Sequence, residues 1–419
     1  MKRRTIALSL LLAMLLAGCM EAPTPSGAAA ETVTSTDQPT PEPTVTPTAA
    51  PTPEPTPTPP TVATLAVCGD AMAHSYISND AWDEERGVYD YSHIMEGARP
   101  YVETADYAVV NLEVPLAGGA PSGYPTFNAD DAMAYNLKDL GFDLCQTANN
   151  HSLDKRYAGL TRTLDVLDEA GLAHVGTSRS PEEAANHVYL ADVGGISVAF
   201  LAYTYGTNAI PIPSDHPECI NVYNKDYMTT LADPDYDYLL EGLESAKALE
   251  PDLIAVMIHW GNEYKIKQNT YQERVADFLF ENGADIILGG HPHVLEPMGF
   301  RELTDEDGET RQGFICYSLG NFFSAQVDEY TNTTVVLTLE LTRDNETGKA
   351  QVTDYSYVPM YVSRTGANPK PRFELMDAHA ALDAGVEDAK LKAKLEKAIQ
   401  DCHDILGPEH DSRYTPAAE

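Results

Sequence analysis

Basic residues are scarce in this chain of 419 residues: 27 Lys and Arg stand against 64 Asp and Glu, and the formal net charge is −37. A surface this acidic repels the phosphate backbone of nucleic acids, so we expect no nucleic-acid partner. It repels acidic polymers for the same reason, unless cations lie between polymer and protein. An anionic partner therefore requires a bridging cation.

Long apolar runs are also scarce. The one at the start, "IALSLLLAMLL" at 6–16, follows three basic residues and is too short to span a membrane, so it predicts a secretory signal peptide over residues 1–19. Its ending, "LAGC", resembles the lipobox of bacterial lipoproteins. The resemblance implies that Cys19 carries a lipid and anchors the chain to the extracytoplasmic face of the cell membrane. The alternative is an ordinary cleaved signal with a chance cysteine.

Aromatic residues are absent from residues 20–62, which consist mostly of Pro, Thr, Ala and Glu. Such a segment cannot form a core, and its prolines favour an extended polyproline conformation of roughly 3 Å per residue, on the order of 100 Å in all. We predict a disordered tether that holds a folded domain away from the membrane.

A disulfide framework is not indicated either. Five of the six cysteines follow Cys19, an odd number, and Cys68, Cys145 and Cys316 lie in apolar runs typical of strands.

The rest of the chain alternates short β-rich runs with helical patterns. The β-rich runs lie at 61–70, 106–115, 141–151, 195–205, 251–261, 283–293 and 313–323. Helical periodicity appears at 157–170 and 271–281, which predicts an α/β domain. Residues 333–342 and 350–362 are typical of added antiparallel strands, and 377–405 of helices. We therefore place the domain at 63–365 and a helical C-terminal extension at 366–419.

Polar side chains able to bind metal follow nearly every one of these runs. They are Asp70, Asn111, Glu113, Asn149, Asn150, His151, His259, His291 and His293. In α/β sheets ligands bind beyond the carboxyl ends of the strands, where residues distant in sequence converge. Each residue alone is more simply a cap, a turn residue or a satisfied polar group, and His74 keeps that interpretation.

The pair His291 and His293 is a stronger signal. Alternate residues of an extended segment share one face, so we expect both imidazoles to point the same way, with Gly289 and Gly290 removing bulk beside them. Imidazoles that share a face form a plausible pair of metal ligands, although Pro292 between them can twist the segment.

Six motifs in order resemble the CapA family of poly-gamma-glutamate capsule synthesis proteins. They are "GD" at 69–70, "NLE" at 111–113, "NNHSLD" at 149–154, "HWG" at 259–261, "GGHPHVLEP" at 289–297 and "YSLGNF" at 317–322. The similarity spans about 65–362. That family resembles in turn the calcineurin-like metallophosphatases, which implies a two-sheet β-sandwich flanked by helices with a two-metal centre at the strand ends.

The resemblance also implies roles for single residues. Asp70 would bind the first metal, Glu113 would bridge, and Asn150 and His259 would bind the second metal. His291 and His293 would complete the two sites, one each. These roles imply one or two divalent ions, Mn, Fe or Zn. His151 would contact the scissile group as a proton donor, with Asp154 orienting it.

The chain departs from the phosphatase pattern at two positions. Met72 stands where a histidine is usual, and Glu113 where an aspartate is usual. The first site then lacks an imidazole. The centre can therefore hold a single metal, or two metals only when substrate bridges them. The alternative is a vestigial centre that binds without turnover.

These features predict a lipoprotein of CapA type, acting in capsule, poly-gamma-glutamate or related exopolymer biosynthesis or export through a phosphoesterase-like centre. Outside the membrane there is no ATP supply, which argues against an ATP-driven ligase step. The substrate would be an anionic exopolymer or a phosphorylated compound, and membrane synthase subunits are expected partners. The alternative is a non-catalytic binding or scaffolding subunit of such a complex.

Overall fold

The computed structural model describes residues 58–304, 308 and 310–415. The predicted signal peptide, Cys19 and nearly all of the predicted tether lie outside the described residues. Contacts group residues 56–419 into one compact unit. No helix in the described part of this unit is long and apolar enough to cross a membrane.

The larger sheet has eight strands. They are β1 (Thr61–Ala71), β4 (Tyr107–Leu112), β5 (Leu144–Gln146), β6 (Ala173–Val175), β13 (Asn321–Phe323), β14 (Thr333–Arg343), β15 (Ala350–Thr365) and β16 (Arg372–Asp377). Their order is β16-β15-β14-β1-β4-β5-β6, with β13 beside β1. β1, β4, β5 and β6 run parallel, whereas β14 to β16 are antiparallel additions. The sequence predicts β14 and β15 but not β16.

The second sheet has six strands. They are β7 (Tyr189–Val193), β8 (Ile196–Thr204), β9 (Leu253–His259), β10 (Ile286–Gly290), β11 (Leu295–Thr304) and β12 (Thr310–Leu319). Their order is β11-β12-β10-β9-β8-β7, parallel at the centre and antiparallel at both edges.

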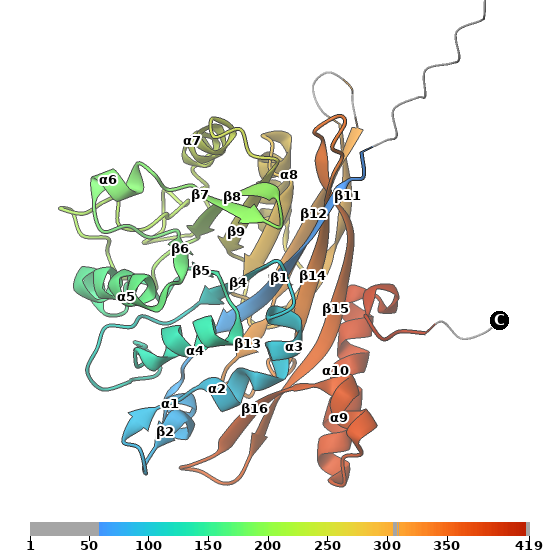
Figure 1. Ribbon diagram of the computed structural model, residues 1–419. Helices are drawn as coiled ribbons and strands as arrows, with labels where there is room; N and C mark the ends of the chain where they lie inside the picture. The colour runs from blue at the N-terminus through green and yellow to red at the C-terminus, as the bar shows by residue number, and fades with distance from the viewer. Residues whose placement is uncertain (1–57, 305–307, 309, 416–419) are drawn as a thin grey trace, which may run out of the picture. The chain divides into compact units, whose positions relative to one another are not determined.

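Helices cover both sheets (Figure 1). Those of the first half are α1 (Ser75–Ala81), α2 (Ser92–Met95), α3 (Arg99–Val102), α4 (Ala132–Leu140), α5 (Arg156–Ala170) and α6 (Pro181–Ala184). Those of the second half are α7 (Tyr236–Lys247), α8 (Thr270–Glu281), α9 (Ala378–Ala384) and α10 (Ala389–Leu406). The short strands β2 (Trp82–Asp83) and β3 (Val88–Tyr89) form a separate ribbon. α5 and α8 match the predicted helices.

The strand pattern explains why the two sheets stack. Along β1, Leu65 and Val67 pack in the cluster between the sheets, while Ala66 and Cys68 pack in the cluster under α1 to α5. A strand buried on both faces alternates between two apolar environments in this way. A third cluster, which includes Trp260, lies between the six-stranded sheet and α7 and α8. The predicted α/β class with sheets flanked by helices is confirmed.

The C-terminal segment differs from the prediction at one point. Residues of β16 form a strand that pairs with β15, because Phe373 and Leu375 alternate with exposed residues and reach the core. The described part of this segment forms the helices α9 and α10 and a short 3-10 helix at Pro408–His410, and α10 closes the edge of the sandwich by placing Cys402 and Leu406 between the sheets. Figure 1 shows α9 and α10 beside β15 and β16. The segment is thus part of the sandwich.

A buried carboxylate fastens this segment. Asp411 accepts hydrogen bonds from Nε2 of His379 and of His403, both at 2.8 Å. We expect Asp411→Ala to lower the free energy of unfolding by about 3 kcal/mol, because two imidazoles lose a charged acceptor. The exposed Asp404 on α10 is the control, and its replacement should change stability by less than about 0.5 kcal/mol. Urea unfolding measures both, and equal effects would contradict the assigned role.

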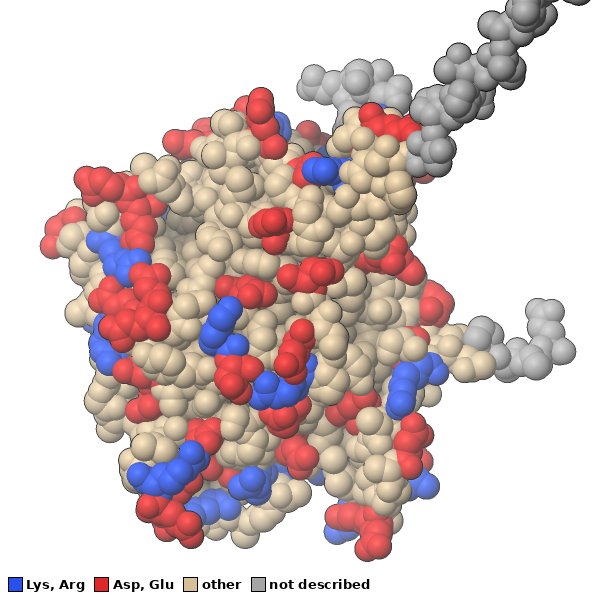
Figure 2. Space-filling model, in the orientation of Figure 1, with Lys and Arg blue, Asp and Glu red and all other residues tan. Residues whose placement is uncertain are grey.

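Charge is distributed over the surface. Figure 2 shows acidic side chains spread over the face in view, with Lys and Arg lying among them. Several of the protein's basic side chains are paired: Arg99 contacts Glu96 and Asp139, and Arg179 contacts Glu183. The face in view thus offers an anion no continuous basic patch.

Candidate metal centre

The carboxyl ends of strands from both sheets bring the predicted ligands together. Asp70 lies near the end of β1 and Glu113 follows β4, both in the eight-stranded sheet. His259 is the last residue of β9, and His291 and His293 follow β10, both strands of the six-stranded sheet. All five side chains are buried, so the centre lies inside the edge of the sandwich.

Their donor atoms form two groups that share one residue. Asp70, Glu113 and His293 make the first group, and Glu113, His259 and His291 the second, with all donor atoms in each group within 4.8 Å of one another. Glu113 Oε1 lies 3.3 Å from His259 Nε2, and its Oε2 lies 3.9 Å from His293 Nδ1. Glu113 therefore lies where a bridging carboxylate is expected, between His293 of the first group and His259 of the second.

Asn150 joins the second group through its amide oxygen. Its Oδ1 lies 3.0 Å from His259 Nε2. Its Nδ2 donates to Oδ1 of Asn208 at 3.1 Å, which fixes the orientation of the amide. The oxygen, the better donor for a cation, is thereby turned toward the centre.

Unpartnered buried atoms test whether these residues fit a metal. Among the described residues, neither carboxylate oxygen of Glu113 accepts a hydrogen bond, and Nδ1 of His291 and Nδ1 of His293 have no hydrogen-bond partner. Leaving such atoms buried and unsatisfied is costly unless something else binds them. Carboxylate, imidazole and amide donors around one point suit a divalent cation. The residues therefore fit the metal centre that the resemblance implies.

The protonation of the centre agrees with this fit. Burial and the neighbouring imidazoles of His259 and His293 lower the pKa of His291 well below its ordinary value, so that ring is neutral. At His293 burial opposes the charged form, but Glu113 and Asp70 outweigh it and raise the pKa to about 9. A cation that binds through His293 therefore displaces a proton at neutral pH.

Asp70 is oriented by a chain of amides. Asn111 Nδ2 donates to Asp70 Oδ1 at 2.7 Å, and Asn149 Nδ2 donates to Asn111 Oδ1 at 3.2 Å. The backbone N–H of His291 donates to the other oxygen of Asp70 at 3.1 Å. Burial opposes ionisation of Asp70, but His293, His259 and Asn111 lower its pKa below the ordinary value.

The backbone at the two histidines differs from the prediction. The expectation of an extended segment with both rings on one face is wrong: φ is +97° at His291 and +59° at His293. Non-glycine residues rarely adopt this region, and such strain is concentrated at functional sites. Asn321 holds the turn by donating from Nδ2 to the carbonyl of His293 at 3.2 Å. The rings still converge, with centroids 5.8 Å apart, through a turn instead of a strand.

Gly290 gives the centre its space. A Cβ at this position would lie 2.6 Å from Oδ1 of Asp70 and 3.4 Å from Nδ1 of His259. Any side chain there would enter the ligand set, as the sequence interpretation of the glycines implies.

His151 and Asp154 lie beside the centre. His151 Nδ1 is 2.8 Å from Asp154 Oδ2, and because a carboxylate only accepts, Nδ1 is the donor. The N–H of Phe127 donates to the same oxygen at 2.7 Å, which fixes the carboxylate. His151 Nε2 lies 4.0 Å from Glu113 Oε1 and is thus directed toward the centre.

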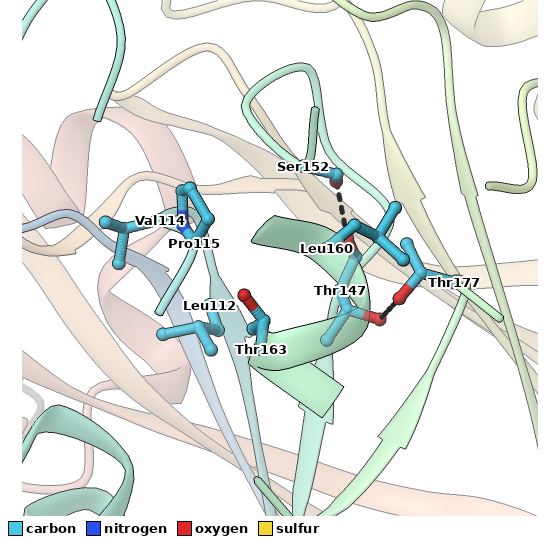
Figure 3. Close-up of a pocket in the computed structure, with 8 residues that line it drawn as sticks. All are labelled: Leu112, Val114, Pro115, Thr147, Ser152, Leu160, Thr163 and Thr177. Atoms are coloured by element: carbon cyan, nitrogen blue, oxygen red, sulfur yellow. Dashed lines mark hydrogen bonds between the residues drawn. The ribbon is translucent and has the colours of Figure 1, made fainter. Parts of the chain in front are cut away.

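The loop that carries His151 is packed against α5. Ser152 Oγ donates to the carbonyl of Thr147, and Thr147 Oγ1 bonds to Thr177 Oγ1 at 2.7 Å (Figure 3). The cavity that these residues line holds about 10 Å³, on the order of a single water molecule. This cavity is too small for a substrate. The residues that line it hold the loop of His151 in place.

Four residues that lie near the metal centre were not predicted from the sequence. They are His74, Tyr205, Asn208 and Glu263. Phe127 stacks edge-on between His74 and His151, at 5.0 and 4.6 Å. Burial and the charges of His293 and His151 lower the pKa of His74 to about 4. The sequence interpretation of His74 as a cap or turn residue therefore did not reveal that it lies near the centre. Tyr205 lies 4.6 Å from His291 between ring centroids. His74 and Tyr205 follow closely after the ends of β1 and β8, and this position was a usable signal in the sequence. Asn208 and Glu263 lie on loops and have no such signal.

Met72 cannot replace the missing histidine. Its side chain is 2 % exposed and packs in the apolar cluster between the eight-stranded sheet and α1 to α5. The first group therefore contains a single imidazole, that of His293.

Comparisons with known proteins show which family the chain is similar to. A capsule biosynthesis protein, CapA, of Bacillus anthracis is 29% identical over 75% of this chain and 70% of its own length. The PGA biosynthesis protein CapA of Bacillus subtilis is 27% identical over 79% of this chain and 82% of its own. A solved phosphatase from Mycoplasma pneumoniae covers 72% of this chain and 94% of its own at 12% identity, with a TM-score of 0.39, too low for any conclusion about this protein.

The model of one protein family matches residues 64–326, which is more than half of the chain and includes every predicted ligand. Its description is bacterial capsule synthesis protein PGA_cap. The chain belongs to this bacterial capsule synthesis family.

Proposed function

We propose that this protein is a metal-dependent phosphoesterase-like enzyme of capsule or related exopolymer biosynthesis or export. The observation that carries the proposal is the pair of donor groups sharing Glu113, with His151 directed at the same point. A pure binding site has no use for an imidazole held by a buried carboxylate beside the ligands.

The ligands would hold one or two divalent cations, of manganese, iron or zinc. Asp70, Glu113 and His293 would hold the first, and Glu113, Asn150, His259 and His291 the second. Bound there, such cations polarise a phosphoryl oxygen and supply a nucleophile near neutral pH. The carboxylates and imidazoles fix the positions of the cations, and the surrounding burial keeps bulk water away from the reacting group.

His151 would act on the leaving group. In the protonated ring, Nδ1 donates to Asp154 and Nε2, which faces the centre, carries the second proton, so Nε2 can pass that proton to the departing oxygen and leave a neutral imidazole. Asp154 also stabilises the ring when it is protonated, as a carboxylate does for a catalytic histidine in general. Asp154 is therefore a positioning residue and His151 the proton donor.

The substrate would be an anionic exopolymer or a phosphorylated compound. The relatives from two Bacillus species are named for biosynthesis of capsule and of PGA. The protein's own charge is strongly negative, so the cations would attract an anionic chain that the rest of the surface repels. Membrane synthase subunits remain the proposed partners.

A second candidate is a binding or scaffolding subunit without turnover. Met72, buried in the apolar core in place of an imidazole, favours it because the first group then holds a cation less tightly. Turnover assays decide between the two. The metal-loaded full chain is assayed with a phosphodiester model substrate and with poly-gamma-glutamate. We expect at least one of these two substrates to be hydrolysed. If neither is hydrolysed while metal is bound, the result supports the binding role.

Attachment to the membrane is part of the proposal. The leader ending in Cys19 supports it. The acidic tether offers no basic patch that could hold the protein to a lipid surface once the lipidation site is removed. Cys19→Ala should move the protein from the membrane pellet to the supernatant after fractionation of cells. A variant that still sediments with membranes would mean that a partner, and not a lipid, holds it.

A further inference from the structure

One carboxylate at the mouth of the centre has no role in the proposed mechanism. Glu263 lies on the loop between β9 and α8, four residues after His259, and is exposed. A carboxylate oxygen of Glu263 and a ring nitrogen each from His291 and His293 lie within 4.8 Å of one another. Two donors bound to one cation at about 2.1 Å are at most about 4.2 Å apart, so a small movement suffices.

The loop is docked over the two histidines. The N–H of Tyr264 donates to the carbonyl of Pro292 at 2.8 Å, and Tyr264 adopts φ +63° to make this contact. Its hydroxyl accepts a hydrogen bond from Gln326 Nε2 at 3.3 Å, and its ring lies 6.2 Å from that of His293. The residue next to Glu263 is thus tied to the turn that carries both ligands. Glu263 is held at the centre by structure and not by chance exposure.

The two histidines provide the independent sign of a ligand. His291 is 5 % exposed and His293 is 2 % exposed. The Nδ1 atom of His291 lacks a hydrogen-bond partner among the described residues, and that of His293 makes no hydrogen bond but lies 3.4 Å from Asp70 Oδ2. Glu263 is the additional carboxylate whose oxygen lies within reach of both rings. The first donor group, by contrast, contains only Asp70, Glu113 and one imidazole.

We propose that Glu263 is a further metal ligand, contributed from the loop after β9, and that it compensates for the imidazole that Met72 does not supply. The inference rests on the metal centre of the proposed function. It makes the loop between β9 and α8 part of the centre. Because His293 lies in one donor group with Glu263 and in another with Asp70 and Glu113, the first cation would have four protein ligands: Asp70, Glu113, His293 and Glu263. Three of the four are carboxylates, which favours manganese or iron over a thiolate-preferring or strongly imidazole-dependent ion.

Metal affinity of the full chain tests this directly. Glu263→Gln keeps the size of the side chain and removes the anionic donor. Isothermal titration of the metal-free Glu263→Gln variant with Mn²⁺ should show a dissociation constant at least ~10-fold larger than that of the wild type for one cation. The dissociation constant of the other cation should stay within ~3-fold of the wild-type value. Glu263→Asp, which keeps the carboxylate but shortens its reach, should lie between the wild type and Glu263→Gln.

Asp328→Asn is the matched control. Burial and the charges of Glu263 and Asp328 raise the pKa of Tyr264 to about 12, so both carboxylates act near this ring. Asp328 is exposed and belongs to neither donor group. Its replacement removes the same charge from the mouth without removing a ligand, and should leave both dissociation constants within ~2-fold.

Three outcomes overturn the inference in different ways. Equal affinities of Glu263→Gln and the wild type would show that Glu263 is not a ligand, while the metal centre stands. Equal losses in Glu263→Gln and Asp328→Asn would assign the effect to charge alone. A wild type that binds no cation would overturn the proposed function together with the inference. A second readout is the visible spectrum of the Co²⁺-loaded chain, which should change in Glu263→Gln but not in Asp328→Asn.

Discussion

Glu113→Gln is expected to empty both halves of the metal centre at once. Glu113 is the residue common to the two donor groups, so its replacement removes a ligand from each. We expect both dissociation constants to rise by at least about 100-fold. Metal per chain, measured by elemental analysis after dialysis against metal-free buffer, should fall to background.

The same variant should not weaken the metal-free fold. Neither oxygen of Glu113 accepts a hydrogen bond among the described residues, and the side chain is fully buried, so in the metal-free protein its charge is offset mainly by the proton that His293 holds. A neutral amide at this position removes both the buried charge and the need for that proton. At a cation concentration 100 times the wild-type dissociation constant, each bound cation stabilises the wild type by about 2.7 kcal/mol, whereas a 100-fold weaker site in Glu113→Gln contributes about 0.4 kcal/mol or less. A metal-free variant that melts well below the metal-free wild type would indicate a structural role instead.

Single histidine variants are the controls for Glu113. His293 belongs to the first group and His291 to the second. Each alanine variant should therefore lose one cation and keep the other, and His293→Ala should lose the more weakly held one because Met72 leaves that group no second imidazole. Loss of both cations from either variant would contradict the assignment of separate sites.

His151→Ala is expected to abolish turnover while both cations stay bound. The ring lies beside the centre and is not a member of either donor group. Removing a general acid reduces kcat by about 10² to 10⁴. Steady-state rates on a phosphodiester substrate, with metal content measured on the same sample, separate this effect from a loss of ligands.

Asp154→Asn refines the test. An amide cannot hold the Nδ1 proton of His151 in the same way, so kcat should fall while KM stays near the wild-type value. Unchanged rates in both variants would remove the proton donor from the mechanism and leave the binding role. Loss of metal from His151→Ala would mean that the ring is a ligand and not an acid.

The sequence predicts the strands and the ligands that follow them because the signals are local. Short continuous apolar runs bounded by turn residues locate β1 and β9, and the polar residue after each run can be seen in the sequence alone. Parallel strands then bring those ends to one edge, which is why Asp70, Glu113 and His259 meet.

Other features depend on contacts between distant segments and were not predictable. The left-handed turns at His291 and His293 need the side chain of Asn321, 28 residues away, to hold the carbonyl of His293. β16 becomes a strand because β15 offers it an edge. Asn208 and Glu263 lie on loops without periodicity, and only the folded chain places them against Asn150 and His293. His74 sits in the first turn after β1, where a capping role is the simpler expectation.

The most direct test of the central claim is the metal content of the purified full chain. The protein is expressed in medium supplemented with manganese, iron and zinc, and the elements are quantified per chain together with those of Glu113→Gln. The account predicts one to two ions in the wild type and none in the variant. A wild type without any of these metals, or a Glu113→Gln variant that retains its full complement, would contradict the metal centre.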